Sequence, residues 1–157
     1  MDIVHSRGIV LSSSSYGESD VQCIVYTRDS GKKRLVFKGL RKSNKRPRTA
    51  SEPGALIDFT YYYHPAKNSH TASDFTCLDN APHIRNDYLR ICVMLFILEI
   101  TDKTTPYDDS SVQLFDLLEA AIKILAETEY PIHLAAVYCL HCLKIHGLQP
   151  EFSLCRM

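Results

Sequence analysis

The sequence lacks any hydrophobic run long enough to cross a bilayer. Its longest uninterrupted apolar run, residues 91–98, has eight residues, whereas a membrane-spanning helix needs about 20. Residues 1–5 also lack the basic start and apolar core of a secretory signal. We therefore expect a cytoplasmic protein without a membrane partner, in which the six cysteines are reduced and serve as small hydrophobic residues.

A net charge is also lacking, because 18 Lys and Arg balance 18 Asp and Glu. The charges are nevertheless distributed unevenly along the chain. Residues 1–79 hold 12 basic and 8 acidic side chains, whereas residues 80–157 hold 6 and 10. Any polyanion is therefore expected to meet the N-terminal half.

The first 79 residues contain β-prone segments and no helical period. Strands are predicted at residues 9–11, 21–27, 32–39, 55–64 and 71–78, separated by turn-forming residues. Residues 16–20, between the first two strands, are expected to form a turn. Residues 41–54 contain Pro47 and Pro53 and are predicted to form a loop. Five short strands indicate a small closed barrel.

The pattern becomes helical after residues 79–82, where capping residues precede a proline. One helix is predicted over residues 83–102, a second after Ser110 or Ser111, and a third from Pro131 to Gly147. The middle of the first is apolar almost all round, so we expect it to be buried. The predicted fold class is α+β: a five-stranded barrel over residues 1–79, followed by a small α-helical domain over residues 80–157.

Several segments in combination resemble the RecO family of bacterial recombination mediators. Residues 8–11, 16–20 and 27–31 resemble its N-terminal signature, and residues 36–43 resemble its basic stretch after the third strand. Residues 98–103, 114–118 and 143–150 are similar to its helical domain. The resemblance implies an OB-fold, binding of single- and double-stranded DNA, and annealing of complementary strands. It also implies recombinase loading with RecR, and contact with the C-terminal tail of single-strand-binding protein.

The sequence departs from that family in length and in its cysteines. Many members are longer and carry a four-cysteine zinc site late in the helical domain. Cys155 stands where the first of those ligands would fall, but its CxxC partner and the second pair are missing. The sequence therefore resembles a short or C-terminally truncated member with an incomplete helical domain, and no metal or other cofactor is expected here.

Half of the basic residues lie between residues 32 and 48, in a stretch of sequence that is free of acids from residue 30 to residue 51. Clustered cations bind nucleic acids by releasing the counterions condensed on phosphates. The alternative is a solvated loop whose charge serves solubility. The predicted DNA-binding residues are Lys32, Lys33, Arg34, Lys38, Arg41, Lys42, Lys45, Arg46 and Arg48. A mixture of Lys and Arg favours contact with the backbone over reading of bases.

Aromatic side chains on the predicted fourth strand offer a second kind of contact. Bases of single strands stack on such rings without regard to sequence. Alternation places Phe59, Tyr61 and Tyr63 on one face, which we expect to be core, and Tyr62 on the other. Tyr62 is therefore the candidate stacking residue.

Cys139 and Cys142, with His141 and His146, could suggest half of a zinc site or a thiol nucleophile. All four lie on a predicted helix, where they are more simply explained as packing residues.

The function predicted from the sequence is a non-enzymatic DNA-binding and strand-annealing protein of the RecO type. One alternative is a protein-interaction module that has lost annealing, and a weaker one is a thiol-dependent enzyme.

Overall fold

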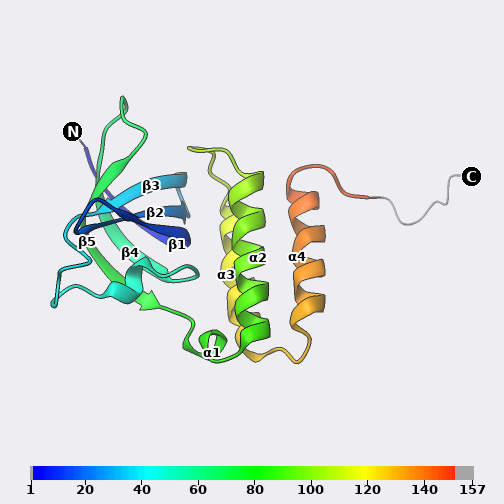
Figure 1. The fold of residues 1–157 in the computed structure, drawn as a ribbon. Coiled ribbons are helices and arrows are strands. Elements are labelled where there is room, and N and C mark those ends of the chain that lie inside the picture. The colour runs from blue at the N-terminus through cyan, green and yellow to red at the C-terminus, as the bar shows by residue number, and fades with distance from the viewer. Residues whose placement is uncertain (1, 151–157) are drawn as a thin grey trace, which may run out of the picture.

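A computed structural model describes residues 2–150, which form a β-barrel beside a group of helices (Figure 1). The barrel strands are β1 (Asp2–Tyr16), β2 (Asp20–Thr27), β3 (Gly31–Phe37), β4 (Leu56–Tyr63) and β5 (His70–Asp79). They pair in the order β1-β2-β3-β5-β4, and β4 pairs with β1 to close the barrel. The β3–β5 pair is parallel and the other pairs are antiparallel. The predicted five-stranded OB-fold is confirmed.

The first strand is much longer than residues 9–11. The serines at positions 12–15 continue β1 and pair with β2, after a bulge between Val10 and Ser12. Val10 faces the barrel interior with Val25, Leu35 and Phe59, while its neighbours Ile9 and Leu11 contribute to a second cluster outside the barrel. Strand β1 thus supplies side chains to two hydrophobic cores.

The helices after the barrel are α1 (Pro82–Arg85), α2 (Tyr88–Thr104), α3 (Val112–Glu127) and α4 (Pro131–Ile145), and a 3-10 helix, η1 (Arg48–Ser51), lies between β3 and β4. The single helix expected over residues 83–102 is divided, because the side chain of Asp87 accepts a hydrogen bond from Arg90 N and starts a new helix. Ser111 caps α3 in the same way through Leu114 N. Among residues 2–150, no helix is long and apolar enough to span a membrane.

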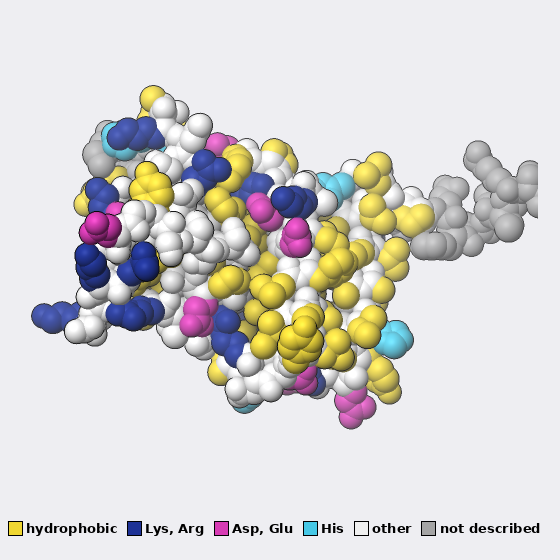
Figure 2. All heavy atoms as spheres, viewed as in Figure 1, with side chains coloured by type: hydrophobic (Ala, Val, Ile, Leu, Met, Phe, Trp, Pro, Cys, Tyr) yellow, Lys and Arg dark blue, Asp and Glu magenta, His cyan; other side chains and the backbone are white. Residues whose placement is uncertain are grey.

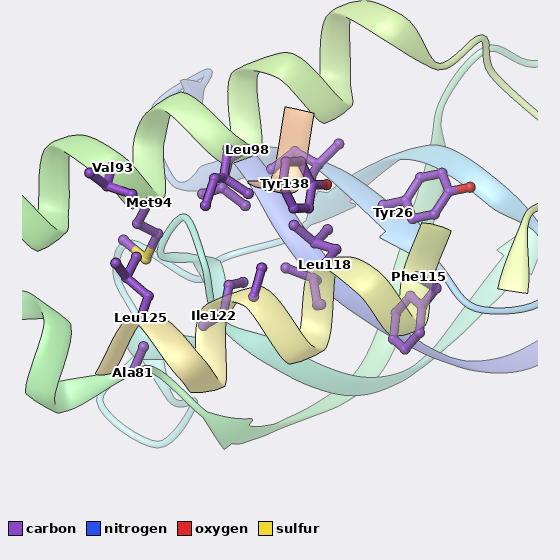
Figure 3. Close-up of a cluster of buried hydrophobic side chains, with 14 of the residues drawn as sticks. Tyr26, Ala81, Val93, Met94, Leu98, Phe115, Leu118, Ile122, Leu125 and Tyr138 are labelled. Atoms are coloured by element: carbon purple, nitrogen blue, oxygen red, sulfur yellow. The ribbon is translucent and has the colours of Figure 1, made fainter. Parts of the chain in front are cut away.

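The barrel and the helices share one hydrophobic cluster (Figure 3). Tyr26 of β2 lies in this cluster with Phe115 and Leu118 of α3 and Tyr138 of α4, and all four are almost completely buried. The hydroxyl of Tyr26 accepts a hydrogen bond from Ser111 N at 3.2 Å. The strands end at Asp79 and α1 begins at Pro82. The division into two domains at residue 79 stays a prediction, because this cluster belongs to both parts.

Helix α2 is buried on one side only. Val93, Met94 and Ile97 are buried, whereas Leu95 and Phe96 are each 45% exposed. The expectation that this apolar helix is buried all round was therefore wrong. The reason is that β1, α1, α3 and α4 cover one face of α2, and nothing else among the described residues covers the other.

Two lysines at the start of β3 link the barrel to the end of α2 and to the α2–α3 connection. The Nζ atom of Lys32 lies 3.0 Å from a carboxylate oxygen of Asp102 and 2.7 Å from the carbonyl oxygen of the same residue. The Nζ atom of Lys33 pairs with the carboxylate of Asp108. Both lysine side chains are only 7% exposed. Gly31 allows this close approach, since a Cβ there would lie 2.4 Å from the carbonyl oxygen of Asp109.

The Asp102→Asn substitution is expected to destabilise the fold, because it leaves the buried ammonium group of Lys32 without a counter-charge. Removing one partner of a buried pair costs about 3–5 kcal/mol. Asp102 is partly exposed, so we expect a loss of about 1–3 kcal/mol in the free energy of unfolding, measured by urea denaturation. The matched control is Glu119→Gln, which removes the partner of the exposed Lys123 on α3. It should cost less than about 0.5 kcal/mol, and equal losses in both variants would contradict the structural role of Asp102.

Candidate nucleic-acid interface

Six of the nine predicted cations form one exposed group, which we call the basic surface. Its members are Lys38, Arg41, Lys42, Lys45, Arg46 and Arg48, and all six are exposed. They follow the end of β3 and continue to the start of η1. Figure 2 shows Lys and Arg side chains gathered over the barrel, whereas the face of the helices in this view is largely hydrophobic. A strand of phosphates can reach this surface without displacing any packed element.

The basic surface is attached to the barrel at its first residues. The side chain of Leu40 is buried in the barrel core, and Gly39 adopts a left-handed φ of 67° that turns the chain out of β3. Gly39 N donates to a carboxylate oxygen of Asp20 at 2.8 Å, and Arg41 N donates to the carbonyl oxygen of Ser19 at 2.9 Å. The turn predicted within residues 16–20 is present at residues 17–19, and it also holds the basic surface in place.

The carboxyl group of Asp20 is ionised when it accepts the hydrogen bond from Gly39 N. The hydrogen bond from Gly39 N, with smaller contributions from the Ser19 hydroxyl and from Lys38, lowers the pKa of its carboxyl group below the ordinary value. The acid therefore stays ionised at neutral pH and accepts the amide hydrogen. The sequence predicted a turn at residues 16–20 but not this bond, because the partner of Asp20 lies 19 residues away along the chain.

Local hydrogen bonds order the rest of this segment without neutralising it. The hydroxyl of Ser43 accepts hydrogen bonds from Lys45 N and Arg46 N. The guanidinium of Arg46 donates to the carbonyl oxygen of Lys38 at 3.0 Å and lies 5.7 Å from the ring of Phe75. The ion pair between Lys42 and Glu18 is 3.7 Å long and exposed, so water and salt weaken it strongly. The charges of the segment remain available to a polyanion.

Two of the predicted DNA-binding residues are buried in the structure, and a third is half-buried. Lys32 and Lys33 are buried and already paired with Asp102 and Asp108. Their assignment to an open phosphate-binding surface is therefore corrected, because a buried, paired ammonium group does not project toward an incoming strand. Arg34 is half-buried and donates to the hydroxyl of Tyr107 at 3.1 Å. These three residues lie at the end of β3 opposite to Lys38.

Tyr62 lies on the outer face of the barrel, as alternation indicates. It is half-buried, while Phe59 and Tyr61 belong to the barrel core. In the strand register Tyr62 pairs with Thr71, which in turn pairs with Val36 of β3. Tyr62 thus lies on the same face of the sheet as Val36 of β3. Stacking of a base on its ring stays a prediction.

The cysteines of α4 are packing residues in this structure. Cys142 is buried and Cys139 is half-buried, and burial raises the pKa of the Cys142 thiol. A raised pKa disfavours the thiolate that a nucleophile or a metal ligand requires. Within residues 2–150, no group of three or more His, Cys, Asp or Glu side chains is arranged to hold a metal ion. Cys155, the candidate remnant of a zinc site, lies outside the described residues.

Nearly the whole chain is similar to known proteins. Residues 1–81 match the family model described as "Recombination protein O N terminal", and residues 85–156 match "Recombination protein O C terminal". Three curated relatives are each named "DNA repair protein RecO". The chain is 25% identical to that of Pelodictyon phaeoclathratiforme over 154 residues, 30% identical to that of Heliobacterium modesticaldum over 156 residues, and 28% identical to that of Bacillus pumilus over 154 residues. The matches cover 98–99% of this chain but only 55–59% of these relatives.

The bond between Asp20 and Gly39 predicts a pH-dependent attachment of the basic surface. Because the pKa of Asp20 is lowered in the folded protein, the stabilisation is complete above the unfolded pKa of about 4 and is lost as the pH falls through the lower, folded value. We expect the Gly39 amide to be protected from hydrogen exchange at neutral pH and to lose this protection in Asp20→Ala, as measured by NMR. Glu18→Ala, which removes a charge from the same turn but no bond to Gly39, is the control. Equal protection in both variants would refute the anchoring role.

Proposed function

This chain belongs to the Recombination protein O family, and from that premise we propose that it is a DNA-binding recombination mediator in DNA repair whose basic surface holds phosphate backbones. The observation that carries the proposal is the grouping of six exposed cations with one weak acidic partner. Such a surface attracts any strand of phosphates. Since the surface is a mixture of Lys and Arg on a loop, binding is expected to depend little on base sequence.

Annealing of complementary strands would follow from the same surface. Two strands repel each other through their phosphates, and a protein that neutralises both lowers that repulsion and lets the bases pair. Tyr62 would add a stacking contact for an unpaired base. The proposed role needs no catalytic group, and the raised pKa of Cys142 supports this choice over a thiol enzyme. Loading of a recombinase with RecR, in the bacterial cytoplasm, belongs to the same proposal.

An alternative is a protein-interaction module of the recombination machinery that has lost annealing. It is favoured by exposed apolar side chains on two helices, which include Leu95 and Phe96 of α2 and Val137 and Leu140 of α4. Clusters of such side chains commonly mark protein contacts. The tail of single-strand-binding protein would be a partner under either function.

Salt-dependent binding to a single-stranded oligonucleotide tests the DNA-binding proposal. We expect the five-alanine variant of Lys38, Arg41, Lys42, Lys45 and Arg46 to bind at least about tenfold more weakly than the wild type at low salt. Each lost contact should lower the slope of log affinity against log salt concentration by about 0.7, so that three to five contacts lower it by about 2–3.5. Fluorescence anisotropy over a salt series measures both quantities.

The matched control removes the same number of charges elsewhere. It carries alanine at the exposed residues Arg7, Arg28, Lys103, Lys123 and Lys144. If both variants lose affinity equally, binding reflects net charge alone and the basic surface has no special role. If neither variant differs from the wild type, the DNA-binding proposal is wrong.

Strand annealing separates the mediator from the interaction module. With two complementary oligonucleotides that carry a donor and an acceptor dye, the wild type is expected to accelerate the appearance of energy transfer. The five-alanine variant should lose this acceleration, because it no longer screens the two strands together. Wild-type protein that binds DNA without accelerating annealing would favour the interaction module instead.

A further inference from the structure

A second cationic site lies at the opposite end of β3 from the basic surface. It is a cavity of about 270 Å³ with walls from three parts of the chain. These are the first residues of β3, the connection between β4 and β5, and the connection between α2 and α3. This volume is just below the roughly 300–1,000 Å³ of small-molecule sites, so the cavity suits at most one small ligand and not a length of strand.

The charge of the cavity is predominantly positive. Lys33, Arg34 and Lys67 line it together with Lys32, and Asp108 is the one acid among its lining residues. Lys32 is neutralised by Asp102 outside the lining. The Nε atom of Arg34 is buried and has no hydrogen-bond partner in the described structure. A buried donor without an acceptor is costly. Arg34 lines the cavity, and a turn of its guanidinium toward a bound anion would give Nε an acceptor.

Aromatic rings form much of the remaining wall. The ring of Tyr107 lies 4.6 Å from Nζ of Lys32 and 5.3 Å from the guanidinium carbon of Arg34. On the other side, the rings of Tyr63 and His70 are 5.2 Å apart. Burial, and to a smaller extent Lys33, lowers the pKa of His70, so this imidazole is neutral at pH 7. Its ring is buried and packs against Tyr63 and Tyr61. The site combines cations with flat faces.

We propose that this cavity binds one nucleotide that carries a phosphate monoester, either free or at the end of a DNA strand. A monoester carries a charge of about −1.5 to −2 at pH 7, more than the single charge of a backbone diester. The guanidinium of Arg34 and the ammonium of Lys33 would hold the phosphate, Lys67 would approach from the loop, and the base would lie against Tyr63 or Tyr107. Internal phosphates of a strand meet the basic surface instead.

Asp108 acts as an internal competitor in this site. Its carboxylate pairs with Lys33 from an exposed position on the α2–α3 connection, where its backbone has a left-handed φ of 62°. An incoming phosphate takes the place of this carboxylate beside Lys33. Nucleotide binding would therefore loosen the ion pair between Lys33 of β3 and the α2–α3 connection, and this connection would respond to occupancy.

The inference adds strand-end recognition to the proposed function, but it rests on a different group of residues. The experiment compares the affinities of 5′-phosphorylated and 5′-hydroxyl oligonucleotides of the same sequence, and titrates deoxyadenosine monophosphate and inorganic phosphate separately. For the wild type we expect at least a threefold preference for the phosphorylated oligonucleotide, and tighter binding of the mononucleotide than of inorganic phosphate. Binding of the mononucleotide alone, without an oligonucleotide preference, would assign the site to free nucleotides.

Three variants test the assignment of the residues. Arg34→Met and Lys67→Met should each reduce the preference, and Lys67 is exposed on a loop, so its replacement leaves the fold intact. Asp108→Asn should strengthen nucleotide binding by about two- to tenfold, because it removes the competing carboxylate. The control, Asp109→Asn, changes an exposed acid of the same connection that does not line the cavity.

Several outcomes would overturn the proposal. If both oligonucleotides bind equally and the mononucleotide does not bind, the cavity is not a nucleotide site. If inorganic phosphate binds as tightly as the mononucleotide, the aromatic walls do not contribute to binding. If both methionine variants keep the preference for the phosphorylated oligonucleotide, the phosphate monoester binds at another site. The five-alanine variant separates the two proposals: it should lose overall affinity yet keep its ratio of phosphorylated to hydroxyl binding. If the wild type binds no oligonucleotide, the mononucleotide titration still tests the cavity.

Discussion

The burial of Lys32 and Lys33 at the start of β3 is the constraint on which the arrangement of this protein depends. A buried ammonium group without a partner is unfavourable, so each of these lysines needs an anionic partner, which Asp102 and Asp108 provide in this structure. Those acids belong to the end of α2 and to the connection that follows it, so the requirement sets where the helices meet the barrel. The shared cluster around Tyr26 then stabilises the contact through burial of apolar surface.

Strand β3 consequently has two different ends. At its first residues the cations are buried, paired or half-covered by Tyr107, and they surround a small cavity. Beyond its last residue the cations are exposed on a segment that is attached to the barrel by Leu40, by the bond from Arg41 N to Ser19 and by the carboxylate of Asp20. The first end is suited to a small ligand of high charge density, and the second to a long polyanion that many weak contacts hold. Sequence neighbours within one basic segment therefore serve two kinds of recognition.

Periodicity predicted most of the fold, since alternation and caps are local signals. It located all five strands, Pro82 at the start of α1, the cap at Ser111 and the inward side of Tyr61, whereas the N-cap of α1 is Ala81 without a side-chain bond. It failed for the serines of β1, which are poor strand formers but pair with β2 in the barrel, and for α2, whose buried side depends on its neighbours. It also failed for Lys32 and Lys33, whose partners lie 70 and 75 residues away. Nothing in the local pattern distinguishes a paired lysine from a free one.

The sequence by itself determined the composition of the binding segment: nine cations in residues 32–48 and no acid among them. It also determined the barrel-then-helices order and the resemblance to a family that the comparisons confirmed. Only the tertiary structure decided which cations face solvent, that Asp20 holds Gly39, and that Tyr107 and Asp108 complete a cavity with β3. The physical reason is that charge is a property of each residue, whereas exposure and pairing depend on what the folded chain brings beside it.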